Sequence, residues 1–193
     1  MKNEEMSTQT KNSLATALKK RMETTEFSKI RVSDLLKDCN IVRSTFYYYF
    51  SDIYELLEWM LNTELIGLLE KCDELYTWDQ GITMLMEYVR DNSKVCLCAF
   101  HSVGRESLEK MFYKNCYVLM ERFVNTGFSN VEVASEDKAF IMDFYVRAYV
   151  SALAAWLVGG MKKNPQAMVD MIERTVSGGI EDALKRSAAS RKS

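Results

Sequence analysis

The chain has 193 residues, with 25 lysines and arginines, 27 aspartates and glutamates, one histidine and a formal net charge of −2. It contains eight glycines and one proline, and this scarcity of turn-forming residues argues against an all-β sandwich or barrel. With 48% hydrophobic residues it can fold around a core, which excludes a disordered chain, and its near-zero charge excludes a polycation that coats nucleic acid.

The cysteines and the first residues indicate a reducing compartment. The chain begins Met1-Lys2-Asn3-Glu4-Glu5, without the apolar run of a signal peptide, and five cysteines are a poor basis for a disulfide framework. The most apolar stretch, 148–161, is shorter than the roughly 20 residues that cross a bilayer. We therefore expect a cytoplasmic protein with no membrane partner.

Apolar residues recur every three or four positions along almost the whole chain, which is the period of an α-helix. We expect an all-α fold that contains no strand. The spacing predicts helices over 10–24, 32–39, 43–50 and 52 to about 75. Further helices are predicted over 79–90, 93–101, 105–126, 136–161 and 165–186.

Several predicted helix ends carry the residue types expected there. Asp52, with Glu55 three residues later, forms the pattern of a capping box. Ser135 is expected to start a helix, because two acidic residues follow it, and the single proline, Pro165, suits a first helical position. The pair Gly159-Gly160 is expected to end the preceding helix.

Charge is distributed unevenly along the chain. Residues 10–50 hold eight Lys and Arg against four acidic residues, whereas the remainder carries a surplus of six negative charges. A basic N-terminal module on an acidic helical body is typical of a DNA-binding domain joined to a sensing or assembly domain. We expect a DNA-binding domain over 1–51 and an effector-binding and dimerisation domain over 52–193.

Residues 32–50 have the pattern of a helix-turn-helix. Two short helices are joined by a turn around Asn40, a residue type that tolerates left-handed backbone. The apolar residues whose spacing lets the helices pack together are Leu35, Leu36, Ile41, Phe46 and Phe50. The other side chains of the second helix are a guanidinium, hydroxyls and phenols, which can bond to base edges and phosphates in the major groove.

This segment resembles the N-terminal signature of the TetR/AcrR family of bacterial transcription regulators over about residues 10–60. The matching positions are Val32, Leu35, Ile41, Thr45, Phe46, Tyr47, Phe50 and Leu56. The resemblance implies binding to double-stranded DNA, with contacts from Arg31, Ser33, Arg43, Ser44, Thr45, Tyr47, Tyr48 and Tyr49. We also expect at least one of the three consecutive tyrosines to pack mostly in the core.

The chain departs from the family pattern at four positions. Val42 stands where the family has a capping serine, so the recognition helix loses a side-chain cap worth about 1 kcal/mol. Asn40 replaces a glycine and Arg31 replaces a threonine. Ile53 replaces a lysine, and the salt dependence of DNA binding is therefore expected to be weaker by about one charge.

Two C-terminal segments are predicted to form a homodimer, as the last two helices do in the resembling family. The segment 151–156 is apolar nearly all round and should be buried on more than one side. The last predicted helix has one apolar stripe, in which Gly178-Gly179 permits close helix approach. The interface residues are Ser151, Ala152, Ala155, Met168, Ile172, Val176, Gly179 and Ile180. Packing inside a monomeric core is the alternative.

The remaining helices are rich in methionine and aromatic residues, and family members often bind a small effector in such a bundle. The candidate pocket residues are Met84, Tyr88, Phe100, His101, Cys116, Tyr117, Met120, Phe144, Tyr145 and Tyr149. Ordinary core packing is the other interpretation of the same residues. We expect an unidentified small-molecule effector and no cofactor.

The sequence gives little basis for a metal site or for catalysis. Of Cys96, Cys98 and His101, only the last two share a helix face, which is too few ligands for zinc. The chain has no glycine-rich phosphate loop, no His-Glu-x-x-His motif and no second histidine. We therefore expect neither metal ligands nor catalytic residues.

The functional hypothesis is a homodimeric transcription regulator on a near-palindromic operator, acting as a repressor released by its effector. The first alternative is an activator or a regulator controlled by a protein partner. Some family members with a similar tyrosine-rich recognition helix and a residue like Trp59 are described as dihydroxyacetone-kinase regulators. The second alternative is a helical ligand carrier or enzyme that keeps the N-terminal module.

Overall fold

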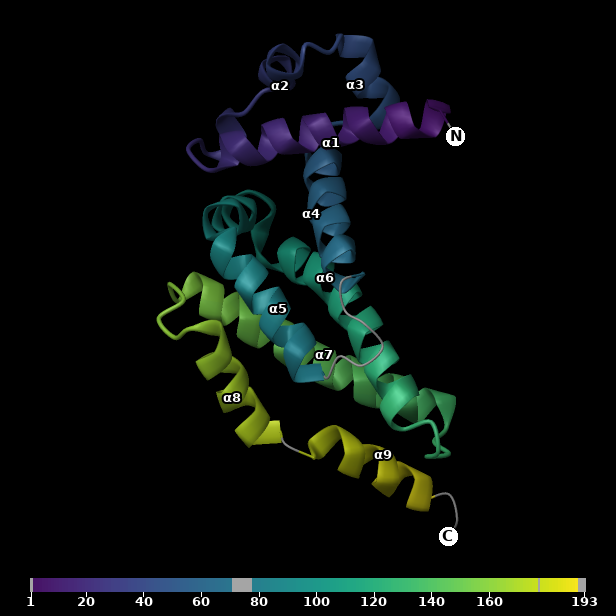
Figure 1. Ribbon diagram of the computed structural model, residues 1–193. Coiled ribbons are helices and arrows are strands. Elements are labelled where there is room, and N and C mark those ends of the chain that lie inside the picture. The colour runs from purple at the N-terminus through teal and green to yellow at the C-terminus, as the bar shows by residue number, and fades with distance from the viewer. Residues whose placement is uncertain (1, 71–77, 177, 191–193) are drawn as a thin grey trace. The chain divides into compact units, whose positions relative to one another are not determined.

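The computed structural model describes residues 2–70, 78–176 and 178–190. Over these ranges the chain forms nine α-helices and one short 3₁₀ helix, with no strand (Figure 1). They are α1 (Lys2–Met22), η1 (Phe27–Lys29), α2 (Val32–Cys39), α3 (Arg43–Tyr49), α4 (Ile53–Leu69), α5 (Trp78–Asp91), α6 (Ser93–Gly127), α7 (Ser135–Val158), α8 (Pro165–Val176) and α9 (Gly179–Ser190). The expected all-α fold is confirmed.

The two short N-terminal helices lie where the apolar spacing predicts them. The predicted helix over 32–39 is α2, and the one over 43–50 is α3, which ends one residue earlier at Tyr49. By contrast, α1 begins eight residues before the predicted position 10. Its first turns are polar, so they carry no apolar period from which a helix could be recognised.

The starts of α4 and α8 are formed by polar caps. Asp52 accepts hydrogen bonds from the backbone N–H groups of Tyr54 and Glu55, at 2.8 and 2.9 Å, as predicted. The Glu55 carboxylate, however, accepts from the backbone N–H of Ser51 at 2.6 Å and not from that of Asp52. Pro165 is the first residue of α8, as predicted. Of the predicted helix over 52–75, the part beyond residue 70 lies outside the described residues.

The start of α7 differs from the prediction by one residue. Ala134 is the N-cap, without a side-chain hydrogen bond, and Ser135 is already helical. The other end is as expected, because Gly159 caps the helix and Gly160 has a φ of 81°, a left-handed conformation that glycine adopts readily.

The predicted break between 101 and 105 is present as a kink. The range of α6 is continuous, but Gly104 has φ 79° and ψ 167°, which is not helical. This region of backbone space is accessible almost only to glycine, so the residue type fixes the position of the kink.

The prediction of one helix over 165–186 is wrong. The chain leaves α8 after Val176, and α9 begins at Gly179, with Gly178 at φ 70°. Gly178 therefore lies at a helix boundary and not within a helix. Gly179 does allow a close approach, because a Cβ at this position would lie 2.5 Å from the Tyr145 hydroxyl oxygen on α7.

Packing divides the chain into two compact units. The N-terminal unit consists of Met1–Leu65 and Asn92–Leu108, and the C-terminal unit of Ile66–Asp91 and Glu109–Ser193. Two helices, α4 and α6, therefore each contribute residues to both units. The functional boundary at residue 51 stays a prediction.

Each unit has its own apolar core. In the N-terminal unit α1 packs on α2, and Figure 1 shows it running beneath both α2 and α3. The fully covered side chains of this unit include Leu14, Leu18, Leu35, Phe46, Leu56 and Leu57. In the C-terminal unit α5 packs on α7 and α8, and α7 packs on α9. The Trp78 and Tyr149 rings lie there with centroids 4.9 Å apart.

One described helix, α7, is long and apolar enough to cross a membrane when judged by length and composition alone. The helix is longer than the apolar stretch 148–161, because it also includes Arg147 and the residues before it. Core helices of soluble proteins meet the same test, and 44% of the most apolar window of α7 is buried inside the fold.

Candidate nucleic-acid interface

The turn between α2 and α3 is fixed by backbone geometry and by a buried apolar contact. Asn40 has φ 52° and ψ 44°, the left-handed conformation expected for it. The backbone N–H of Ile41 donates to the carbonyl of Leu36 at 3.0 Å, which closes the turn. Leu35 and Phe46 are completely buried, so the inner faces of both helices are committed to the core. The outer face of α3 is consequently held in one orientation.

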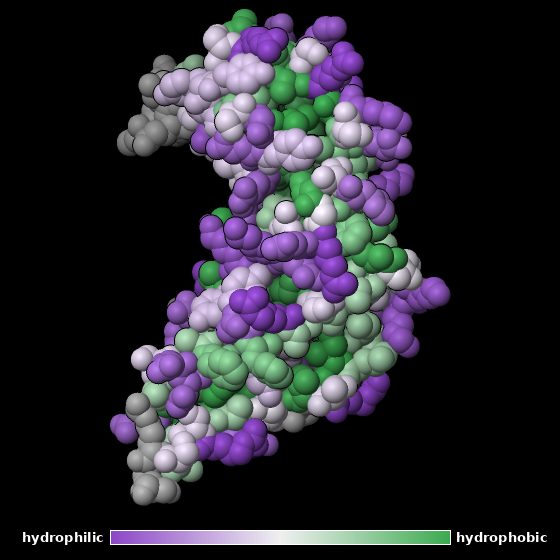
Figure 2. Space-filling model, turned by 180° about the vertical axis from the view of Figure 1, so that it is seen from behind, coloured by the Kyte–Doolittle hydropathy of each residue, from purple (hydrophilic) through white to green (hydrophobic). Residues whose placement is uncertain are grey.

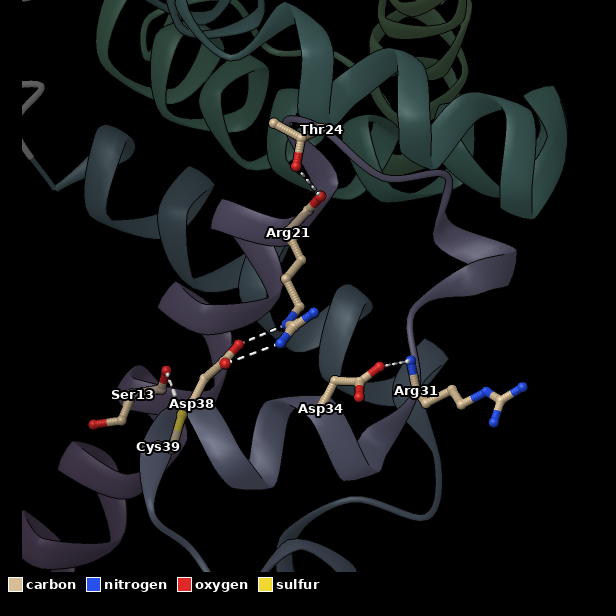
Figure 3. A network of polar contacts seen from close by, with 7 residues as sticks. All are labelled: Ser13, Arg21, Thr24, Arg31, Asp34, Asp38 and Cys39. Carbon is tan, nitrogen blue, oxygen red and sulfur yellow. Dashed lines mark hydrogen bonds and ion pairs between the residues drawn. The ribbon is translucent and has the colours of Figure 1, made fainter.

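Polar contacts hold α2 on α1 (Figure 3). The Arg21 guanidinium donates two hydrogen bonds to the Asp38 carboxylate, at 2.5 and 2.9 Å. These bonds hold the pKa of Asp38 below its usual range and raise the pKa of Arg21. Next to this pair, the Cys39 thiol donates to the carbonyl of Ser13 at 3.4 Å.

The start of α2 presents groups suited to phosphate. The Asp34 carboxylate accepts a hydrogen bond from the backbone N–H of Arg31 at 3.3 Å. The Arg31 side chain is exposed, and Figure 3 shows its guanidinium pointing away from this network. Ser33 is exposed in the first turn of the same helix. A guanidinium, a hydroxyl and a helix N-terminus together form a typical phosphate-binding arrangement.

The exposed face of α3 carries the predicted DNA contacts of its first two turns. Arg43 and Ser44 are exposed, Tyr47 is 47% exposed and Tyr48 is 81% exposed. The Arg43 guanidinium lies 5.3 Å from the centroid of the Tyr47 ring and donates to the Tyr47 hydroxyl at 3.4 Å. The arginine is thus partly arranged before any DNA arrives, which lowers the entropy lost on binding.

Thr45 and Tyr49 are more covered than their neighbours. The Lys11 ammonium of α1 lies 5.4 Å from the Tyr49 ring and 5.9 Å from the Trp59 ring of α4. Tyr49 therefore lies on the side of α3 that faces α1 and α4. Of the three consecutive tyrosines it is the one that approaches the expected packing role, although it is not completely buried.

One predicted dimer residue of α7, Ala152, and the three of α8 line a groove of about 220 Å³ on the C-terminal unit. Its walls combine residues predicted for the interface with two predicted for the effector pocket. The lining residues are Tyr145, Ala148, Tyr149, Ala152, Met168, Met171, Ile172, Thr175 and Val176. Gly179 and Ile180, by contrast, pack within the chain, the first against Tyr145 and the second in the core.

A stripe of exposed side chains, mostly apolar but interrupted by Arg147 and Ser151, runs along α7 beside this groove. Phe140 is 70% exposed, Phe144 is 60% exposed, and Val158 at the other end of the helix is also exposed. Ser151 and Ala155 are exposed as well, so α7 is buried on one side and not on all sides within the chain. Figure 2 shows apolar side chains, in green, gathered on an exposed face of the C-terminal unit. Such a face is typical of a protein–protein interface.

The ten predicted effector residues are divided between the two units. Phe100 and His101 belong to the N-terminal unit, and the other eight to the C-terminal unit. Cys116 and Met120 are buried, and burial raises the pKa of the Cys116 thiol to about 12. Met84, Tyr88, Tyr117 and Tyr145 are partly buried, Tyr149 is buried, and Phe144 is exposed.

A small cavity that the sequence did not indicate lies beside Trp78 in the C-terminal unit. Its volume is about 120 Å³, and its walls are Trp78, Phe123, Phe128, Tyr149, Glu173, Val176, Gly178, Ile180 and Glu181. The Trp78 indole N–H is buried and has no hydrogen-bond partner among the described residues. Buried donors are normally satisfied, so this group marks a place where a hydrogen-bond acceptor fits.

The family described as the transcriptional regulator C-terminal region, of TetR type, matches residues 76–178, slightly more than half of the chain. This chain belongs to the TetR family of transcriptional regulators. DNA binding follows from that membership, and the family is not a class of enzymes.

Two matches to proteins named DhaS illustrate the similarity. The HTH-type dhaKLM operon transcriptional activator DhaS of Lactococcus lactis subsp. lactis (strain IL1403) is 31% identical over 83 residues. That alignment covers 43% of this chain and 44% of the relative, less than half of either. The solved structure of the dihydroxyacetone kinase operon activator DhaS matches with a TM-score of 0.72, over 89% of this chain and 96% of that one. At 21% identity this likeness concerns the fold.

Two departures from the TetR pattern have visible structural consequences. Val42 is the N-cap of α3 and makes no side-chain cap hydrogen bond, as predicted. It is 66% exposed. Ile53, in place of the family lysine, is partly buried at the start of α4. This position therefore contributes packing and no positive charge.

The side chains considered for metal binding are not arranged as a site. Cys96 is buried, and burial raises its pKa to about 12. The Cys98 thiol donates to the carbonyl of Thr25 at 3.6 Å, and His101 is exposed. Among the described residues, no three potential ligands cluster closely enough to hold an ion.

Proposed function

We propose that this TetR-family regulator binds an operator sequence in double-stranded DNA through α3, with phosphate contacts from the start of α2. The observation that carries the proposal is the division of α3 into two faces. Phe46 is completely buried, whereas Arg43, Ser44, Tyr47 and Tyr48 are exposed on the other side. Guanidinium, hydroxyl and phenol groups are suited to base edges and phosphates.

The regulator acts as a homodimer in this proposal, with the interface on α7 and α8. The support is the exposed apolar stripe around Phe140 and Phe144 beside the groove that contains Met168 and Ile172. A monomer would leave this surface in water, at a cost proportional to its apolar area. A two-fold axis repeats α3 on the DNA, so the operator is near-palindromic.

A small molecule regulates DNA binding in this proposal by favouring one of two arrangements of the dimer. The cavity beside Trp78 is the candidate site, because its indole N–H lacks a partner among the described residues. It shares Tyr149 with the residue set expected from the sequence. A compound that stabilises the protein strongly against heat, yet leaves operator affinity unchanged, contradicts this part of the proposal.

The similarity to DhaS, which is named as an operon activator, supports activation as the direction of control. Repression relieved by an effector is the direction expected from the TetR resemblance, and control by a protein partner is a further possibility. A reporter gene behind the upstream region of the gene distinguishes activation from repression. Activation requires expression to fall when the regulator is deleted, whereas repression requires it to rise. Such a regulator acts in the cytoplasm, where the DNA is.

The DNA proposal is tested by fluorescence anisotropy on duplexes from the upstream region of the gene itself. We expect saturable binding that Arg43→Ala weakens by about tenfold or more, because one arginine–base contact is worth about 1–3 kcal/mol. Thr45→Ala should weaken binding less, since Thr45 is partly covered. Lys162→Ala, an equal loss of charge at an exposed position of the C-terminal unit, is the control. Equal affinities of wild type and Arg43→Ala contradict the proposal.

A further inference from the structure

The start of the recognition helix carries an aliphatic side chain in an unfavourable place. Val42 is 66% exposed and occupies the N-cap position of α3. A valine there leaves the first backbone N–H groups of the helix without a side-chain acceptor, whereas serine, threonine, asparagine or aspartate supplies one. Its branched apolar side chain also lies in water and contributes nothing to the core.

Other helix starts show that this chain does use polar caps. The Asp52 carboxylate accepts two backbone N–H groups at the start of α4. The Asn164 amide oxygen accepts the backbone N–H of Ala167 at 2.7 Å at the start of α8. Ala134 also lacks a cap at the start of α7, but its single methyl group is partly covered. Val42 alone among these combines a missing cap with a largely exposed branched side chain.

The position of Val42 places it among the groups that meet DNA in the proposed function, on which this inference rests. In a helix-turn-helix the N-terminal residues of the second helix contact base edges in the major groove. Arg43 and Ser44, the next two residues, are exposed beside it. Because Val42 has no polar side-chain atom, it cannot read a donor or an acceptor. The major groove offers one apolar group for such a side chain, the C5-methyl of thymine.

We propose that Val42 is a specificity-determining residue that contacts a thymine methyl in each half of the operator. The contact removes both methyl surfaces from water, and it is worth about as much as burying one methylene group. This corresponds to about a fourfold preference for thymine in each half-site and about fifteenfold for both. Arg43 and Tyr47 supply polar recognition, and Val42 adds discrimination at one further base pair.

The test begins with selection of binding sites from random duplex DNA by the full-length wild-type protein and by Val42→Ser and Val42→Ala. We expect one pair of symmetry-related thymines in the wild-type consensus to lose its preference in both variants, while the other positions keep theirs. Replacing this pair by deoxyuridine, which lacks only the methyl group, should weaken wild-type binding by about fifteenfold and binding of either variant by less than twofold.

Comparing the two variants distinguishes two causes of a lost thymine preference: the loss of the methyl contact, and a change in the stability of the helix start. Val42→Ser restores a cap and Val42→Ala does not, so only the serine variant should raise the thermal stability of the N-terminal unit. If Val42→Ser keeps the thymine preference, or if deoxyuridine weakens all three proteins equally, Val42 is not the reader. A uniform loss of affinity for every sequence also overturns the inference, because it indicates that Val42 acts through contacts within the protein and not through a base. If the wild type selects no sequence, the proposed function itself fails.

Discussion

The two units of this protein expose opposite kinds of chemistry from the same type of element. On α3 the exposed side chains are Arg43, Ser44 and the phenols of Tyr47 and Tyr48. On α7 they include Phe140 and Phe144, which are more exposed than Tyr47. Both helices bury their other face, so the difference lies only in what faces outward.

This difference shows which partner each surface is suited to. A groove lined by phosphates selects cations and hydrogen-bonding groups, whereas another protein surface can cover apolar side chains. The two surfaces also depend on different supports. The α3 surface depends on a small core around Phe46, whereas the α7 stripe lies on a long helix with eight buried residues. The predictions below test whether the two surfaces can be disrupted separately.

The largest effect is expected from Phe46→Ala. Removing a completely buried phenyl ring should lower the free energy of unfolding of the N-terminal unit by about 3–5 kcal/mol and abolish DNA binding. Urea titrations followed by circular dichroism measure the loss, and sedimentation shows whether dimerisation persists. Tyr48→Ala, at an 81% exposed position of the same helix, should change stability by no more than about 0.5 kcal/mol. If Phe46→Ala abolishes dimerisation as well, the two surfaces cannot be disrupted separately.

An intermediate effect is expected from Phe144→Lys on the α7 stripe. A lysine in the middle of an apolar interface should raise the dimer dissociation constant by about thirtyfold or more, because a central aromatic residue is worth about 2 kcal/mol. Analytical ultracentrifugation measures this constant. Val118→Lys is the matched control, since Val118 is an exposed valine of α6 in the same unit. Should both variants or neither dissociate the dimer, the stripe is not the interface.

The smallest effect concerns Asp38, whose pKa is lowered by its hydrogen bonds with Arg21. A lowered pKa means that the ionised carboxylate stabilises the folded state above the unfolded pKa of about 3.9, and that this contribution disappears as the pH falls through the folded pKa. Asp38→Asn should therefore lower the melting temperature slightly near pH 7, and this difference should shrink as the pH falls below about 4.

Thermal melts across this pH range measure the difference. Glu132→Gln, at an exposed carboxylate of the C-terminal unit, should show no comparable pH-dependent difference. A difference between wild type and Asp38→Asn that persists unchanged at pH 2 shows that the side chain acts in another way. The screening of this exposed pair by salt should also reduce the effect.

The helix-turn-helix was predictable because its determinants are local in sequence. Leu35 and Phe46 are separated by a single turn, and Asn40 marks that turn by its residue type. A period of three to four and one left-handed residue therefore sufficed to place α2 and α3. The outward position of Tyr48, which is 81% exposed, follows from the same period, because it lies two residues after Phe46 and so on nearly the opposite side of the helix.

The C-terminal unit was less predictable because its determinants are contacts between distant segments. The break at Gly178 and the close approach of Gly179 to Tyr145 depend on how α9 returns to α7. The cavity beside Trp78 is likewise formed by residues from five helices, α5 to α9, together with Phe128 and Gly178. The sequence alone does not show whether an apolar residue is buried within the chain or remains exposed for contact with a partner.

The sequence by itself determined the helical class, the helix-turn-helix and the residue types available to DNA, because these depend on short-range periodicity and on the conformational preferences of single residues. The tertiary structure decided which apolar residues remain exposed, with Phe144 outside and Met120 inside, and which buried donor lacks a partner. The physical reason is that burial is a property of the assembled helices. When a helix has apolar residues on all sides, its sequence predicts that the helix forms, but only packing against other helices determines which face is buried.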